Sequence, residues 1–207
     1  MTICLGAYDM LNLDEDFWSF RYQNGATGWD IGYASPPLYQ YLCQIHTKTI
    51  DILVPGGGNA YEVAAGWALG FQNLHLLDIS NLPIHNFLEK NPAFTKSQIH
   101  HQDFFEHKGS YDLVLEQTFF CALEPGLRPV YAKKMHELLN PGGRLVGVLF
   151  DREFPQMGPP FAGSAEEYRI YFEPYFELEK FEPCYNSIPE RQGSELFIKL
   201  KKSDIKD

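Results

Sequence analysis

The sequence is short of cysteine and of positive charge, and it has no long apolar run. Its four cysteines form no CxxC pair, and no histidine stands at metal-ligand spacing from them, so neither a disulfide framework nor a metal site is expected. No apolar run approaches the roughly 20 residues that cross a bilayer, so no membrane partner is expected. The first basic residue is Arg21, whereas a signal peptide begins with positive charge. These absences predict a reduced protein of the cytoplasm.

Basic residues are too few for a nucleic-acid partner. Lys and Arg total 17 against 27 Asp and Glu, which leaves a net charge of -10. Nucleic-acid binding depends on basic side chains that neutralise phosphates, and these are scarce here. Four lysines gather near the end of the chain, where we expect a solvated terminus rather than an anion site: Lys199, Lys201, Lys202 and Lys206.

Short apolar segments alternate with helical patterns through the middle of the chain. The length of 207 residues and the hydrophobic fraction of 44% suit one compact domain over residues 1–207. Strands are predicted at residues 50–54, 74–78, 98–102, 111–116 and 144–150. Helices are predicted at residues 60–69, 84–91 and 129–139. This alternation is typical of a buried parallel sheet, so it predicts a doubly wound α/β fold with three layers.

The two ends of the chain depart from this rhythm. Beyond residue 150 we expect a loop rich in Pro and Gly, a helix at 164–171 and two antiparallel strands at 176–183 and 195–200. Residues 1–45 combine acidic residues with aromatic ones and end in a predicted helix at 37–44. This aromatic segment is either a lid over a site or a plug at the end of the sheet.

A glycine cluster after the first predicted strand indicates a nucleotide site. Pro55-Gly56-Gly57-Gly58 leads into a helix, where glycine permits a sharp turn and close approach to a ligand. Asp78 ends the next strand, 20 residues after Gly58, which matches the spacing of the acid that binds ribose hydroxyls. The alternative for Asp78 is a cap for the following turn. The pairing of loop and acid favours a nucleoside cofactor.

Nicotinamide dinucleotides and S-adenosylmethionine both use this arrangement. Asp103 follows the third strand, where its carboxylate suits the adenine amino group, and Phe104 beside it suits the adenine face. We expect Phe105 to lie in the core instead. The antiparallel pair at the end of the chain is more typical of methyltransferases than of dehydrogenases, which is an analogy of fold.

A series of motifs over residues 17–161 resembles the thiopurine S-methyltransferase-like family. The branch with plant halide and thiol methyltransferases is the most similar. The motifs are Phe17-Trp18, Tyr22, Gly28-Trp29-Asp30-Ile31-Gly32, Pro55-Gly56-Gly57-Gly58, Leu77-Asp78-Ile79-Ser80, Asp103-Phe104-Phe105, Thr118-Phe119-Phe120-Cys121-Ala122-Leu123, Arg128-Pro129, Asn140-Pro141-Gly142-Gly143 and Gly158-Pro159-Pro160-Phe161. Two positions depart from the family pattern: Tyr22 replaces a second Trp, and Glu116-Gln117 replaces Asp-Tyr.

The resemblance implies a Rossmann-like methyltransferase fold with a mostly parallel seven-stranded sheet and an antiparallel C-terminal strand. It implies S-adenosylmethionine as cofactor and S-adenosylhomocysteine as product. The implied acceptor-orienting residues are Arg128, Phe119 and Tyr22; for Arg128 the alternative is a surface residue that starts a helix. The implied cofactor-binding residues are Trp18, Tyr22, Trp29, Gly56, Gly58, Asp78, Ile79, Asp103, Phe104 and Gln117.

These residues predict methyl transfer to a small sulfur nucleophile (thiol, thiopurine or thiocyanate) or to a halide. Attack by such an anion on a sulfonium methyl cancels charge, so a dry aromatic pocket favours it and no proton moves. Glu116 is the one carboxylate placed to act as a base for a neutral acceptor. The alternatives are an amine or hydroxyl acceptor, a NAD-dependent oxidoreductase, and a binding scaffold without catalysis. We expect a small-molecule substrate and a monomer or weak homodimer.

Overall fold

A computed structural model describes residues 12–156 and 158–204. The seven strands form one sheet in the order β3-β2-β1-β4-β5-β7-β6. β1 to β5 are parallel, and β7 runs antiparallel to both β5 and β6. The strands are β1 (Asp51–Pro55), β2 (Asn73–Asp78), β3 (Ile99–His101), β4 (Tyr111–Gln117), β5 (Leu139–Phe150), β6 (Phe176–Pro183) and β7 (Glu195–Lys202). The expected mostly parallel sheet with an antiparallel C-terminal strand is confirmed.

Apolar residues on both faces of each strand explain why the sheet lies in the middle of the molecule. In β1, Ile52 and Val54 face one core cluster, and Leu53 between them faces the other. In β4, Leu113 and Leu115 alternate in the same way with Val114, which faces the second cluster. Successive strand side chains point to opposite faces, so a continuous apolar run fills both cores.

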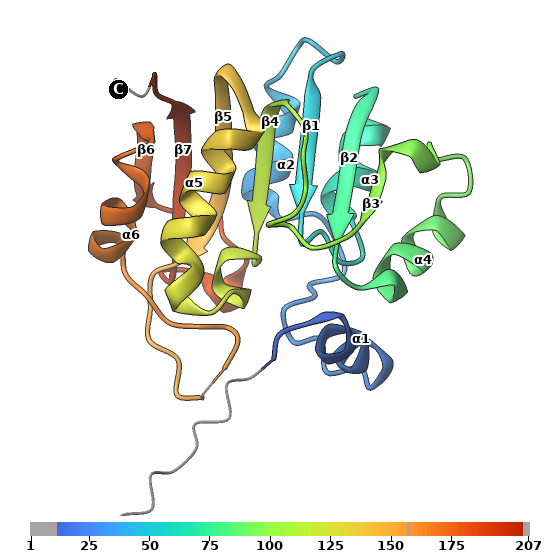
Figure 1. Cartoon of the computed structure of the whole chain (residues 1–207), viewed down its shortest axis with the longest axis horizontal. Helices are drawn as coiled ribbons and strands as arrows, with labels where there is room; N and C mark the ends of the chain where they lie inside the picture. Colours follow the sequence, from blue (N-terminus) through green and yellow to red (C-terminus); the bar gives the residue numbers. More distant parts are fainter. Residues whose placement is uncertain (1–11, 157, 205–207) are drawn as a thin grey trace, which may run out of the picture.

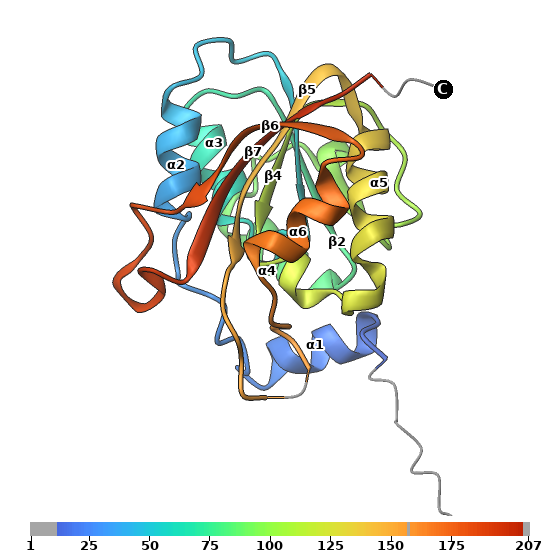
Figure 2. The same cartoon turned by 90° about the vertical axis from the view of Figure 1, so that its left-hand side faces the viewer.

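Helices cover both faces of the sheet, and one helix lies beyond the carboxyl ends of its parallel strands. Figures 1 and 2 show α5 and α6 on one face, α2 and α3 on the other, and α1 beyond the carboxyl ends of the parallel strands. The helices are α1 (Glu15–Gln23), α2 (Pro36–Cys43), α3 (Tyr61–Ala68), α4 (Asn81–Lys90), α5 (Arg128–Leu138) and α6 (Ala165–Phe172). The position of α1 matters for function, because ligands of such folds bind at the carboxyl ends of the strands.

Three features differ from the sequence-based expectations. The aromatic N-terminal segment contains a helix, α1, which begins at the N-cap Asp14. β5 begins at Leu139 and includes the Asn140-Pro141-Gly142-Gly143 segment. The described lysines of this end belong to β7, which runs to Lys202, and two of them form ion pairs there, Lys199 with Glu179 and Lys201 with Glu177. Lys199 lies 3.0 Å from the Glu179 carboxylate, while Lys206 lies outside the described residues.

The described part of the chain contains no helix that is both long and apolar enough to cross a membrane. Among the described residues, Cys43, Cys121 and Cys184 are free thiols. Cys4 lies outside the described residues.

Candidate active site

The turn after β1 requires glycine at two positions. Gly56 and Gly58 both have positive φ, at 56° and 53°, a region that favours glycine. A Cβ on Gly56 would lie 2.3 Å from the Phe119 ring, and one on Gly58 would lie 2.5 Å from the Tyr22 hydroxyl. The loop is therefore packed between an aromatic ring from the N-terminal segment and one from the β4 side.

Asp78 links this loop to the turn that follows β2. Its Oδ2 accepts a hydrogen bond from the backbone N of Gly58 at 2.8 Å, and its Oδ1 accepts one from the backbone N of Ser80 at 2.8 Å. Burial raises the pKa of the Asp78 carboxyl to about 6, against the two backbone donors, which lower it. The carboxylate bonds the turn before α4, as the capping alternative predicts, and it also lines the cavity described next, where the ribose-binding role stays a prediction.

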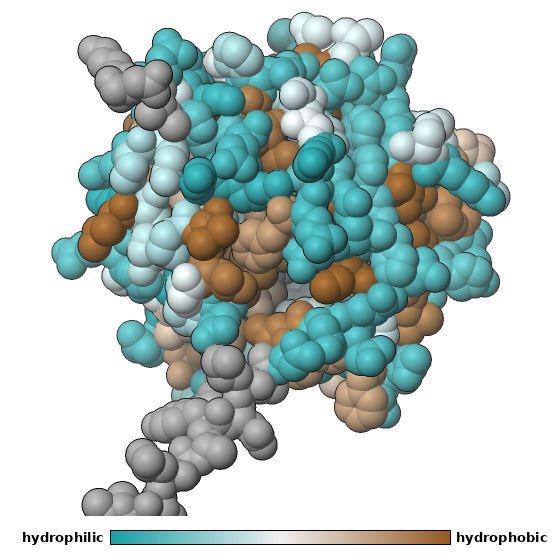
Figure 3. Space-filling model, viewed as in Figure 1, coloured by the Kyte–Doolittle hydropathy of each residue, from teal (hydrophilic) through white to brown (hydrophobic). Residues whose placement is uncertain are grey.

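A cavity of about 440 Å³ lies at the carboxyl ends of the strands. Its lining comes from α1 and the segment after it, from the loops after β1, β2, β3, β4 and β5, and from the β6–β7 connection. Figure 3 shows hydrophobic side chains gathered around a hollow on this side of the molecule. Mixed aromatic and charged lining of this kind is typical of a small-molecule site.

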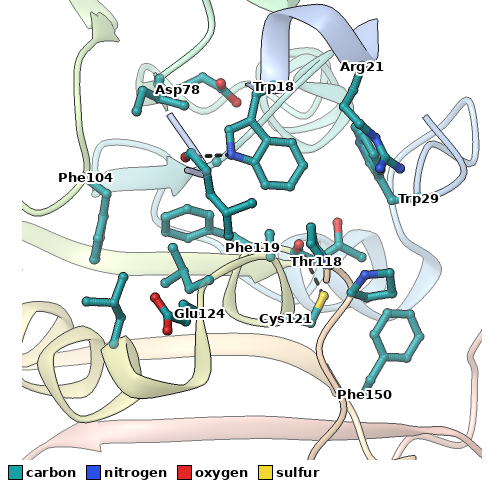
Figure 4. Close-up of a pocket in the computed structure, with 18 of the residues that line it drawn as sticks. Trp18, Arg21, Trp29, Asp78, Phe104, Thr118, Phe119, Cys121, Glu124 and Phe150 are labelled. Atoms are coloured by element: carbon teal, nitrogen blue, oxygen red, sulfur yellow. Dashed lines mark hydrogen bonds between the residues drawn. The ribbon is translucent and has the colours of Figure 1, made fainter. Parts of the chain in front are cut away.

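The N-terminal aromatic residues form one wall of the cavity. Trp18 and Tyr22 project from α1, and each packs edge-to-face on Trp29, with ring centroids 5.6 and 5.7 Å apart. The indole N of Trp18 donates to the Leu13 carbonyl at 3.2 Å, which fixes the ring (Figure 4). Edge-to-face packing of this kind stabilises the cluster beyond burial alone. These rings therefore line the cavity.

The facing wall comes from the loops after β3 and β4. Phe104 is buried and packs edge-to-face on Phe119, with ring centroids 5.1 Å apart. Phe105 is only partly buried and also lines the cavity, so the expectation that it lies in the core is wrong. Asp103 lines the cavity beside them, and its Oδ1 accepts from the backbone N of Phe105.

A second cavity of about 50 Å³ lies beside the glycine loop. It shares Tyr22, Trp29, Gly56 and Thr118 with the larger cavity. Two buried acceptor oxygens among the residues that line it have no hydrogen-bond partner: Asn59 Oδ1 and Gln117 Oε1.

Unpartnered buried acceptors call for a donor. The amino group of S-adenosylmethionine is such a donor, its ribose hydroxyls suit Asp78, and the glycines leave the space that a bound nucleoside needs. The residues present therefore fit this cofactor.

The structure brings every expected cofactor-binding residue to these two cavities. The larger one is lined by Trp18, Tyr22, Trp29, Gly56, Asp78, Ile79, Asp103 and Phe104, together with the expected acceptor-side Phe119. The smaller one is lined by Gly58 and Gln117. Ten of these residues are spread over 100 positions of the sequence, so only the fold makes them neighbours.

Arg128 is the expected site residue that the structure does not bring to either cavity. Its side chain is buried, and its guanidinium donates to Glu167 Oε1 and to the Ala162 carbonyl, both at 2.7 Å. It also lies over the rings of Phe120 and Tyr168, at 5.2 and 5.4 Å from their centroids. Arg128 is neither a surface residue nor a cavity residue, because its two hydrogen bonds tie α5 to α6 and to the loop before α6.

Two arginines that sequence reasoning missed do line the larger cavity. Arg191, in the β6–β7 connection, is buried; it donates to the Trp29 carbonyl at 2.8 Å and lies 3.4 Å from Glu195. Arg21 of α1 lies over the Trp29 ring, 5.2 Å from the centroid. Arg191 stands 162 positions from its partner Trp29, so no local signal marks it.

Glu116 is buried behind the cavity wall rather than in the cavity. Its Oε1 accepts from the backbone N of Phe119 at 2.8 Å and of Phe120 at 2.9 Å, and its Oε2 accepts from the Tyr131 hydroxyl. Burial raises the pKa of this carboxyl to about 7. Because neither cavity is lined by Glu116 and its oxygens are occupied, the geometry gives it a structural place and does not support a base that reaches the acceptor.

The remaining polar clusters carry no metal-binding geometry. Within the described residues, no group of three or more His, Cys, Asp or Glu side chains is arranged to hold a metal ion. The adjacent histidines point to different partners, as expected: His100 lies 3.0 Å from a ring nitrogen of His75, and His101 lies 2.9 Å from Glu15 of α1.

Solved structures share this arrangement of sheet and helices. A Burkholderia thailandensis 1,6-didemethyltoxoflavin-N1-methyltransferase, crystallised with S-adenosylhomocysteine, superposes with a TM-score of 0.75 at 16% identity, over 92% of this chain and 87% of that one. The fold is that of the S-adenosylmethionine-dependent methyltransferases.

Sequence comparison then gives the family. The thiopurine S-methyltransferase family matches residues 13–200. A probable thiol methyltransferase 2 from Arabidopsis thaliana is 32% identical over 90% of this chain and 84% of its own length. A thiocyanate methyltransferase 1 from Brassica oleracea is 30% identical over 92% and 86%. The chain belongs to the thiopurine S-methyltransferase family. It is an S-adenosylmethionine-dependent methyltransferase, which excludes the dehydrogenase alternative.

Proposed function

We propose that this enzyme transfers a methyl group to a small sulfur nucleophile, a thiol, thiopurine or thiocyanate, or to a halide. The observation that carries the proposal is a largely aromatic cavity that continues from the glycine loop and has the buried cation Arg191 in its wall. The relatives named for thiol and thiocyanate methylation support the same acceptor class.

The cofactor would occupy both cavities. Asp78 accepts from the ribose hydroxyls, Asp103 and Phe104 hold the adenine, and Asn59 and Gln117 accept from the amino group. Trp18, Tyr22 and Trp29 from the N-terminal segment then act as a lid over the cofactor. Aromatic faces also attract a neighbouring cation, which suits a sulfonium.

When bound, S-adenosylmethionine supplies an electrophilic methyl group on a cationic sulfur. In-line attack by the acceptor on this methyl group would release S-adenosylhomocysteine, and the residues that line the cavity would align the two molecules. No proton moves in this step. The protein contributes by alignment and by exclusion of water, which solvates separated ions better than the charge-dispersed transition state.

Arg191 is the group that favours an anionic acceptor. A thiol must lose its proton before attack, and a nearby positive charge lowers the pKa of a thiol and so raises the thiolate fraction. Arg191 is held in place by Trp29 and Glu195 and lines the cavity, so its charge acts inside the site. Arg128 acts only indirectly here, through the loop that carries Ala162.

A methyl-transfer screen with radiolabelled donor tests the proposal. The acceptors are iodide, bromide, thiocyanate, hydrosulfide, benzenethiol and a thiopurine, with an amine and a phenol as the contrasting set. We expect labelled products from the sulfur and halide set. Products from the amine or phenol alone would contradict the acceptor class while leaving the cofactor in place.

Reduced cysteines further support our proposal of a cytoplasmic enzyme.

A further inference from the structure

Thr118 has a backbone conformation that its side chain disfavours. In the described residues, only Ala60 and Thr118 are non-glycine residues with positive φ, at 56° and 55°. A β-branched side chain in this region clashes with its own backbone, so the conformation costs free energy. Ala60 belongs to the glycine loop, where the chain must turn before α3. Thr118 follows β4 directly, where the chain turns toward Phe120.

A buried network keeps Thr118 in this conformation. Glu116 Oε1 accepts from the backbone N of both Phe119 and Phe120, the two residues after Thr118. The Cys121 thiol donates to the Thr118 carbonyl at 3.4 Å. Strain that surrounding contacts enforce is found most often at functional sites. The location of the side chain then indicates which function it serves.

Thr118 lies where the two cavities meet. It is one of four residues that line both, with Tyr22, Trp29 and Gly56. Figure 4 shows it on the cavity wall between Phe119 and Cys121, across from Trp18. No hydrogen bond within residues 12–156 and 158–204 uses the Thr118 hydroxyl. Among the other three residues that line both cavities, the side-chain donors are the Tyr22 hydroxyl and the Trp29 indole.

We propose that Thr118 is an acceptor-positioning and specificity-determining residue: its hydroxyl donates to the anionic acceptor at the junction through which the methyl group passes. This inference rests on the proposed function. A ligand that extends from the glycine loop into the acceptor side of the cavity must pass Thr118. The strained backbone fixes Thr118 at that point, among the residues that line both cavities.

Three variants separate the hydroxyl, the methyl group and the strain. Thr118→Ser keeps the hydroxyl, Thr118→Val keeps the shape without the hydroxyl, and Thr118→Gly removes both and relieves the backbone. Thr95→Gly is the control, because Thr95 has an ordinary φ of -73° and is remote from the cavities. Each protein is assayed with thiocyanate and benzenethiol for kcat and KM. Its S-adenosylhomocysteine affinity is measured by calorimetry, and its Tm by thermal unfolding.

We expect Thr118→Val and Thr118→Gly to lower kcat/KM at least tenfold, and Thr118→Ser to stay within threefold of the wild type. The affinity for S-adenosylhomocysteine changes less than threefold in all three. The Tm of Thr118→Gly equals or exceeds that of the wild type and exceeds that of Thr95→Gly, because only the first substitution relieves strain. Thr118→Gly also favours the bulkier benzenethiol relative to thiocyanate.

Two results overturn the inference alone: a Thr118→Val enzyme with wild-type kcat/KM, or a loss of cofactor affinity that parallels the loss of activity. A Thr118→Gly protein that is less stable than the Thr95→Gly control contradicts the strain argument and with it the inference. A wild-type enzyme that methylates no thiol, thiocyanate or halide contradicts the proposed function itself, and the inference falls with it.

Discussion

Two buried carboxylates, Asp78 and Glu116, lie at the carboxyl ends of β2 and β4, on either side of β1, and differ in function. Both have a raised pKa, because burial penalises the charged form more than the backbone donors favour it. Asp78 lines the cavity and is open to ligand donors, whereas Glu116 is enclosed by Phe119, Phe120 and Tyr131. We therefore expect the titration of Asp78 to change the affinity for the cofactor, and the titration of Glu116 to change the folding stability.

Cofactor affinity should depend on pH through Asp78. Ribose hydroxyls donate to the ionised carboxylate, so S-adenosylhomocysteine binds best above the Asp78 pKa of about 6 and more weakly below it. Asp78→Asn lowers the affinity at pH 8 at least tenfold and removes the dependence between pH 5 and 8. Calorimetric titration measures both. Asp112→Asn is the control, since Asp112 bonds Asp51 and Asn140 away from the cavities. A pH dependence that survives in Asp78→Asn contradicts this role.

Folding stability should depend on pH through Glu116. Its folded pKa, about 7, lies above the ordinary value of 4.5, so its contribution is fully present below pH 4.5 and is lost as the pH rises through 7. The loss amounts to about 3 kcal/mol. Glu116→Gln keeps an acceptor for the backbone of Phe119 and flattens this part of the profile. Urea unfolding between pH 4.5 and 8 measures how the free energy of unfolding changes with pH in the wild type and in Glu116→Gln. Equal slopes for the two proteins would rule out Glu116 as the source of this pH dependence.

The two buried arginines should divide catalysis from stability. Arg191→Met removes the cation from the cavity, and we expect kcat/KM for thiocyanate to fall at least tenfold. Arg128→Met leaves the Ala162 carbonyl without this donor, removes one of the two donors to Glu167 Oε1 and takes a buried cation from two rings, so we expect it to cost about 2–3 kcal/mol of stability.

Steady-state kinetics with thermal unfolding compares the two variants. S-adenosylhomocysteine affinity stays within threefold in both. The kcat/KM values are calculated per concentration of folded protein. A larger loss of kcat/KM in Arg128→Met than in Arg191→Met would indicate that Arg128, and not Arg191, orients the acceptor.

At the scale of elements, α1 packs against α4 but buries little of its own surface. None of its residues is fully buried. Ser19 shares a 2.8 Å hydrogen bond with Ser80, and Glu15 lies 2.9 Å from His101. Segments with little buried surface open at low free-energy cost. Because Trp18 and Tyr22 of this helix line the cavity, a bound nucleoside should add the contacts that α1 lacks.

Amide hydrogen exchange tests this prediction. We expect α1 to exchange rapidly in the free protein and to become protected when S-adenosylhomocysteine is added. α6, whose Tyr168 and Phe172 are fully buried and outside the cavities, should be protected in both states and serves as the control. If α1 already matches α6 without ligand, α1 is a fixed part of the domain rather than a lid.

Sequence patterns located the central elements well and the ends less well. The five parallel strands are continuous apolar runs, which the two cores require, and glycines punctuate them. The sequence did not predict α1, because its aromatic residues face a cavity and not a core, so its hydrophobic residues do not recur with the period of a helix. The start of β5 was not predicted because Asn140-Pro141-Gly142-Gly143 carries turn residues. Leu139 pairs with Tyr111, and the regular pairing with β4 begins only at Arg144.

At the scale of the molecule, the acceptor side of the site depends on distant segments. Most of the expected cofactor-binding residues, from Gly56 to Gln117, stand at or just after the ends of strands, where motifs mark them. Arg191 follows from no motif, because it acquires its place through Trp29 at the other end of the chain. Thr118 lies within a motif, but the sequence does not show its strained backbone, which a buried carboxylate maintains. Arg128 lost the expected role because helix packing buries its side chain.

The anomalous signal of bromide in crystals grown with S-adenosylhomocysteine tests the central claim most directly. The ion stands in for the anionic acceptor, and the product marks the cofactor. We predict nucleoside density at Asp78 and one bromide in the larger cavity between Thr118 and Arg191. Nucleoside density in that position with bromide only on the protein surface would contradict the acceptor site, and nucleoside density away from Asp78 would contradict the account as a whole.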